Sequence, residues 1–135
     1  MHALLILLLA ADLTAVKNEP NLEHRSELAL DYAHASIDAA RDSYNAGDAA
    51  KLQSALAEAG EAVDVAYQAL SDTGKHPRNN KYFKRAELRT RELTRRLDGL
   101  SHTVGVDDRD SITKLRDHIA EVHDNLLKGI MSKKK

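Results

Sequence analysis

Apolar residues recur at alternating steps of three and four along most of the chain after Pro20. This period is typical of amphipathic helices that pack against neighbouring helices. Four segments share it, and their predicted bounds are residues 21–46, 48–73, 79–104 and 107–130. The residues between these segments are ones that end or begin helices. Gly47 suits the left-handed position after a helix, and Asp48 can cap the next helix. Pro77 prevents the second helix from continuing.

The repeated apolar positions predict which side chains form the core. In the first two segments they are Leu30, Ala33, Ile37, Ala40 and Tyr44, then Leu52, Leu56, Ala59, Val63, Ala66 and Leu70. In the last two they are Phe83, Ala86, Thr90, Leu93, Leu97, Leu100 and Val104, then Ile112, Leu115, Ile119, Val122, Leu126 and Ile130. The first pair of helices is therefore expected to be rich in alanine inside, and the second pair rich in leucine.

These patterns predict an all-α fold. Helices of this length with short loops favour an antiparallel (up-down-up-down) four-helix bundle or two long helical hairpins. The chain has 135 residues and only 4% aromatic residues, so one domain with a core of Leu, Ile, Val and Ala is expected. We predict that this domain spans residues 20–131 and that residues 132–135 form a basic tail.

Residues 1–15 form a separate apolar N-terminal segment, which we interpret as a signal peptide. The run from Ala3 to Ala11 carries no charge and would reach about 14 Å as a helix. A bilayer core is about 30 Å thick, so no transmembrane span is expected. The run has the length of a signal hydrophobic region, and Ala11 or Ala15 could precede a cleavage point.

Two features of this segment depart from a standard signal. No Lys or Arg precedes the apolar run, and neither candidate site has an A-x-A pattern. An uncleaved lipid-dipping anchor and a buried N-terminal helix therefore stay open as alternatives. We expect an exported protein, periplasmic or secreted, with a cytoplasmic location as the alternative.

Charge is unevenly distributed along the chain. Residues 1–73 carry a balance of −8, and residues 74–135 carry +7. The cations concentrate in the third segment, whose basic row we take as the candidate surface for an anionic partner. Its main residues are Lys84, Arg85, Arg89, Arg95 and Arg96.

Three interpretations of this basic row remain open. The cations can pair with the acidic first half of the chain, where they would help to select which helices meet. They can form a face for an anionic partner, or they can simply be a solvated helix face. Glu87 with Arg91, and Glu92 with Arg96, are also spaced for ion pairs within the helix.

The residues of catalytic and metal sites do not form recognisable patterns. The chain has no Cys, so thiol chemistry and disulfides are excluded. Seven His are present, but His118 and His123 lack the four-residue spacing that places two imidazoles on one helix face. Asp107, Asp108 and Asp110 fit the start of a helix better than a calcium loop. We predict no enzyme activity, no cofactor and no metal site.

The sequence therefore predicts a non-catalytic, exported helical protein that contacts another protein or an anionic envelope component. The first alternative is an intracellular helical protein that binds nucleic acid or another anionic partner through the basic third segment. The second is a self-assembling structural protein, in which alanine-rich hairpins pair between chains to form a homo-oligomer.

Overall fold

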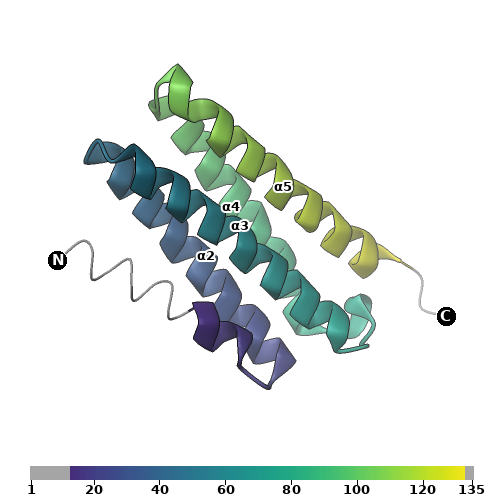
Figure 1. The fold of residues 1–135 in the computed structure, drawn as a ribbon. Helices are drawn as coiled ribbons and strands as arrows, with labels where there is room; N and C mark the ends of the chain where they lie inside the picture. Colours follow the sequence, from purple (N-terminus) through teal and green to yellow (C-terminus); the bar gives the residue numbers. More distant parts are fainter. Residues whose placement is uncertain (1–12, 133–135) are drawn as a thin grey trace.

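The computed structural model describes residues 13–132, and every regular element within that range is helical (Figure 1). A short helical stretch at residues 13–17 comes first. The main elements then follow as α2 (Leu22–Asn45), α3 (Ala49–Asp72), the 3-10 helix η1 (Pro77–Asn79), α4 (Lys81–Thr103) and α5 (Val106–Met131). The all-α prediction is confirmed, and each long helix begins and ends one or two residues from its predicted bounds.

The helix ends follow the predicted turn chemistry. Gly47 has a φ of 74°, the left-handed conformation that glycine adopts without steric cost. The Asp48 side chain then accepts a hydrogen bond from the Lys51 amide at 3.0 Å and caps α3. At the start of α4, the Asn80 side chain accepts hydrogen bonds from the amides of Tyr82 and Phe83. These local interactions fix where the chain reverses.

The predicted core positions are buried almost without exception. All of those in α3 and α4 are buried, and only Tyr44 of α2 and Ile130 of α5 lie partly exposed at the edge of the core. Alanine occupies much of the buried surface of α2 and α3, which lets these two helices pack closely. Leucine and isoleucine fill the space between α4 and α5.

Packing between the helices is most extensive within the pairs α2–α3 and α4–α5. The two pairs meet mainly where α2 contacts α4 and α3 contacts α5, with a smaller contact between α3 and α4. Figure 1 shows the four long helices lying alongside one another, with η1 at the end of the molecule where α5 finishes. The loop that carries η1 packs against both α4 and α5.

The helical core extends N-terminal to α2. Leu13 and Val16 are buried in the main apolar cluster, and Lys17 forms an ion pair with Glu61 of α3. The remainder of the predicted signal segment, residues 1–12, and most of the basic tail, residues 133–135, lie outside the described residues. Within residues 13–132, none of the helices combines the length and the apolarity needed to span a membrane.

Candidate interaction surface on helix α4

Helix α4 carries the five cations that the sequence singled out, and three of them lie along its contact with α2. Arg85 forms an ion pair with Glu27 at 3.5 Å, and Arg89 forms one with Asp31 at 2.7 Å. Arg96 pairs with Asp38 and also contacts the His34 ring. These pairs link the acidic first half of the chain to the basic second half, as the internal interpretation of the charges expects.

The spacing of these pairs defines how α2 and α4 are aligned. In each of the three ion pairs, the arginine lies 58 residues after its carboxylate partner. We call this line of contact between the two helices the α2–α4 seam. A constant difference in residue number requires two helices that run in the same direction, because antiparallel helices would give a constant sum. The acidic row of α2 and the basic row of α4 therefore run in parallel and in register.

The other two predicted cations, Lys84 and Arg95, lie on the outer side of α4. Both are exposed, and neither has an ion-pair partner within the described part of the chain. Between them lies Leu88, whose exposed fraction of 57% is high for a large apolar side chain. We name this face the outer stripe, and it consists of Lys81, Lys84, Leu88, Arg91 and Arg95.

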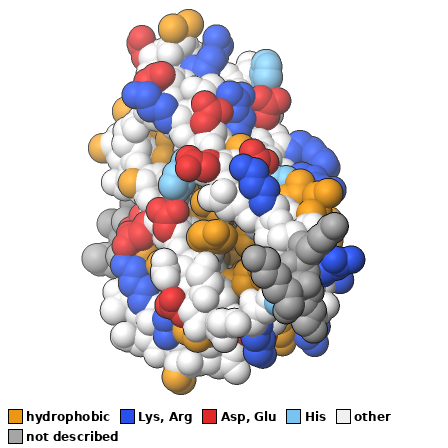
Figure 2. All heavy atoms as spheres, turned by 90° about the vertical axis from the view of Figure 1, so that its right-hand side faces the viewer, with side chains coloured by type: hydrophobic (Ala, Val, Ile, Leu, Met, Phe, Trp, Pro, Cys, Tyr) orange, Lys and Arg blue, Asp and Glu red, His pale blue; other side chains and the backbone are white. Residues whose placement is uncertain are grey.

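The outer stripe itself contains four cations and no carboxylate. Arg91 is partly neutralised by Glu87 at 2.7 Å, and Glu92 adds one carboxylate beside the stripe. Figure 2 shows Lys and Arg interspersed with Asp and Glu over the face that it presents.

Glu87 itself departs from the simple helix pattern, because it is buried. Its exposed fraction is 8%, and its second carboxylate oxygen lies 3.0 Å from Nε2 of His123 on α5. The sequence indicated its pairing with Arg91 but gave no sign of the contact with His123. The other expected pair within α4, Glu92 with Arg96, is replaced by the contact of Arg96 with α2.

Histidines elsewhere also lie beside single carboxylates. His118 contacts Asp64 at 2.7 Å, and His24 contacts Glu19 at 3.2 Å. Within residues 13–132, no three ligating side chains are grouped closely enough to hold a metal ion.

A second polar cluster lies where α2 and α4 both begin. Glu23 of α2 accepts a hydrogen bond from Nδ2 of Asn80 at 2.7 Å and another from Nζ of Lys75 at 3.2 Å. The Asn80 hydrogen bond, followed by the hydrogen bond and positive charge of Lys75 and the charge of Lys81, lowers the pKa of Glu23, although its partial burial opposes this. The cluster joins the loop before α4 to the first turn of α2.

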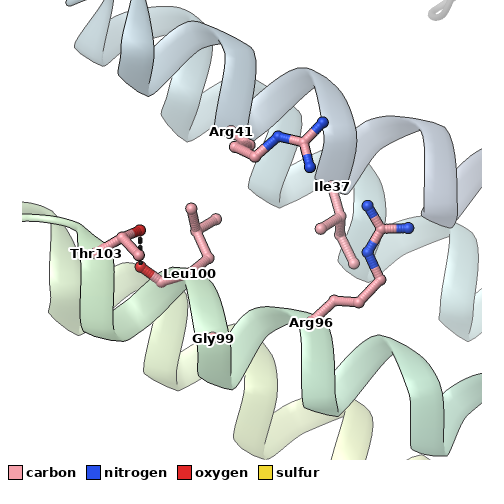
Figure 3. A pocket seen from close by; sticks show the side chains of 6 residues that line it. All are labelled: Ile37, Arg41, Arg96, Gly99, Leu100 and Thr103. Carbon is pink, nitrogen blue, oxygen red and sulfur yellow. Dashed lines mark hydrogen bonds between the residues drawn. The ribbon is translucent and has the colours of Figure 1, made fainter.

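A pocket of about 300 Å³ opens further along the same α2–α4 contact (Figure 3). Arg41 from α2 and Arg96 from α4 lie at its rim, and Ile37 and Leu100 form apolar walls. Gly99 and Thr103 complete the lining on the α4 side. The sequence pattern marks Arg96 as a surface cation but gives no sign of a cavity beside it.

Comparison with known proteins adds no family to this description. The sequence matches no protein-family model, and no curated protein matches it significantly.

Proposed function

We propose that this protein is a non-catalytic, exported interaction module that binds an acidic partner protein through the outer stripe of α4. The observation that carries this proposal is the pair of exposed cations Lys84 and Arg95 on either side of the exposed Leu88, neither of which has an ion-pair partner among residues 13–132. Unpaired surface charges steer a partner of opposite charge and contribute to specificity.

The composition of the stripe favours a protein partner over a polymer of uniform charge. An apolar centre with a polar and charged rim is the usual arrangement of a protein–protein contact. A purely electrostatic partner would make little use of Leu88. An anionic envelope component such as lipid or polymer is the second form of the same proposal.

The proposed location rests on the apolar run from Ala3 to Ala11. Cleavage after Ala11 would keep both Leu13 and Val16, which are buried in the core. Cleavage after Ala15 would remove Leu13. We therefore favour Ala11 as the last residue of the signal peptide.

The proposed bundle topology is two hairpins, α2–α3 and α4–α5, packed side by side in up-down-up-down order. It is supported by the extensive packing within each pair and by the constant 58-residue register between α2 and α4. In this arrangement α4 contacts α2 on one side and α5 on another, which leaves the outer stripe facing solvent.

The first alternative is an intracellular protein whose basic half binds nucleic acid. The balance of +7 in residues 74–135 favours it, because nucleic-acid affinity depends on cation number and falls steeply with salt. The pairing of Arg85, Arg89 and Arg96 with α2 leaves fewer cations for that role.

The test is photo-crosslinking in living cells, with a crosslinking amino acid at position 88 of the full chain. We expect one protein to be crosslinked. That protein is then purified, and its affinity for the full chain is measured in a direct binding titration. Lys84→Glu with Arg95→Glu should weaken its binding about tenfold or more, since two favourable surface contacts become repulsive. The melting temperature should not change, because neither side chain pairs within the described structure.

Two further variants serve as controls. Lys114→Glu with Lys128→Glu makes the same change in net charge on α5, and binding should be retained. Reversal of Arg85, Arg89 and Arg96 to Glu should instead lower the melting temperature, because it breaks the pairs with α2. The proposal is wrong if the outer-stripe variant binds normally, or if position 88 crosslinks only to nucleic acid or to a second copy of this chain.

A further inference from the structure

The pocket between α2 and α4 has features that binding through the outer stripe does not explain. It has a volume of about 300 Å³, at the lower end of the range for small-molecule sites. Its lining comes from two helices and combines apolar walls with two guanidinium groups (Figure 3). Its position on the α2–α4 seam separates it from Lys84 and Leu88.

The first of these features is Gly99, which lies within α4 and lines the pocket. Glycine inside a helix is less favourable than alanine, because it loses more conformational freedom on folding. At Gly60 and Gly129 the reason is close packing, because an added Cβ would lie 3.2 Å from Leu115 and 3.0 Å from Pro77, respectively. At Gly99 an added Cβ would meet no atom of residues 13–132 within 4 Å.

Helix packing therefore does not account for Gly99. What the missing side chain does provide is open space on the α4 wall of the pocket. A larger residue would project from this wall and reduce the volume beside Leu100.

The second feature is the state of the Arg41 guanidinium. It is about half exposed, and the nearest carboxylates among residues 13–132, those of Asp38 and Asp42, lie 3.8 Å away. This distance is too long for a hydrogen bond, so charge attracts the groups without occupying the N–H donors of Arg41. A carboxylate ligand could accept those hydrogen bonds in a bidentate manner.

Arg96 has a different part in the same pocket. Its contacts with Asp38 and His34 hold it in place on the rim. It adds positive charge there, while its Nη1 and Nη2 atoms contact His34 and Asp38 of α2.

The deeper part of the pocket is apolar. Ile37 and Leu100 are 2% and 8% exposed, so little of either side chain faces bulk water. The Thr103 hydroxyl donates its hydrogen bond to the Leu100 carbonyl oxygen at 2.9 Å and so does not offer that proton to a ligand. The pocket therefore places a cationic rim above an apolar wall.

We propose that this pocket binds a small organic anion, a carboxylate with a short aliphatic or aromatic body. The carboxylate would bond to Arg41 near the charge of Arg96, and the apolar body would lie against Ile37 and Leu100. This inference does not rest on the proposed function, because the outer stripe and the pocket use different residues.

Octanoate is a suitable probe, because its ten heavy atoms combine one carboxylate with an aliphatic tail. For a ligand of this size we expect a Kd of about 0.2–6 mM. In a two-dimensional NMR titration of the full chain, the signals of Gly99 and Leu100 and the side-chain signal of Arg41 should shift saturably. Acetate lacks the tail and octanol lacks the charge, so each should bind at least about tenfold more weakly than octanoate.

Two variants test the two features separately. Gly99→Leu should fill the pocket and abolish the saturable shifts, while the open space at that position allows the chain to fold normally. Arg41→Gln should weaken octanoate binding about tenfold, since it removes a charged hydrogen-bond donor. Lys114→Gln on α5 removes an equal charge elsewhere and should leave binding unchanged.

The melting temperature of each variant confirms that the fold is intact. The proposal is wrong if octanoate gives no saturable shift at these residues, or if a folded Gly99→Leu protein binds it as tightly as the original chain. It is also wrong if octanol binds as tightly as octanoate, because the guanidinium groups would then have no role.

Discussion

At the scale of single residues, the contacts of Asn80 show how one polar side chain can connect two helices. Its oxygen accepts hydrogen bonds from the first amides of α4, and its nitrogen donates to Glu23 of α2. The side chain is only 7% exposed, so both ends of the amide are satisfied within the protein. Asn80 therefore caps one helix while fixing the position of another.

The partner of this amide gives the protein a predicted pH dependence. The pKa of Glu23 is lowered below its ordinary value of 4.5, first by the Asn80 hydrogen bond. The unfolded chain then binds a proton on Glu23 more readily than the folded chain does. The stability from this group is present above its unfolded pKa and is lost as the pH falls through the folded pKa.

Glu23→Gln should therefore destabilise the protein at pH 7 and have less effect at pH 3, because this stabilisation is lost progressively as the pH falls below the unfolded pKa of Glu23. Urea unfolding of both proteins at the two pH values measures this difference. Glu121→Gln, at an exposed position of α5, is the control and should have little effect at either pH. An equal loss of stability from Glu23→Gln at pH 7 and pH 3 would contradict the assignment.

Single-residue contacts were the hardest part to predict from the sequence. The burial of Glu87 against His123 joins residues 36 positions apart, and no local pattern marks it. The link between Asn80 and Glu23 spans 57 positions. Such contacts depend on which helices become neighbours. The apolar period of one helix does not specify which other helix it will pack against.

At the scale of the helix, prediction worked because the controlling signals are local. The 3.5-residue period placed the buried faces of all four helices, and glycine and aspartate marked turns. The charged partners were less predictable, because an arginine can reach either along its own helix or across to another. Arg91 bonds within α4, whereas Arg96 bonds across to α2.

Leu97 offers a direct test of the α4 core stripe. It is fully buried in the main apolar cluster, so Leu97→Ala should cost about 2–5 kcal/mol through lost burial and a residual cavity. Leu88→Ala removes the same atoms from an exposed position of the same helix and should change stability by less than about 0.5 kcal/mol. Denaturant unfolding of the two variants measures both values, and similar losses would contradict the burial of Leu97.

At the scale of the whole molecule, the charge balance held more information than the apolar pattern. All four helices share one period, so that period could not decide which of them meet. The division into an acidic and a basic half predicted that the halves could pair, and the α2–α4 seam contains those pairs. The same seam divides the five predicted surface cations, because three contact α2 and two remain on the outer stripe.

The first residues of the chain bear on the molecule as a whole, because the fold limits where a signal could be removed. Leu13 is 5% exposed within the core cluster, so processing that leaves it in place is compatible with the full stability of the bundle. Loss of Leu13 would remove a buried side chain, at a cost of about 2–5 kcal/mol by analogy with Leu→Ala substitutions. Stability and processing are therefore linked at this end of the protein.

Expression of the full chain with its native N-terminus tests this link through the intact mass of the product. If export occurs as proposed, the mass should correspond to loss of residues 1–11, with Asp12 at the new N-terminus. Chains beginning at Asp12 and at Val16 can then be compared by thermal unfolding, and the longer one should melt at a higher temperature because it retains Leu13. A soluble product with its full mass would contradict export and would direct the search for partners to the inside of the cell, where nucleic acid becomes the first candidate for the basic half.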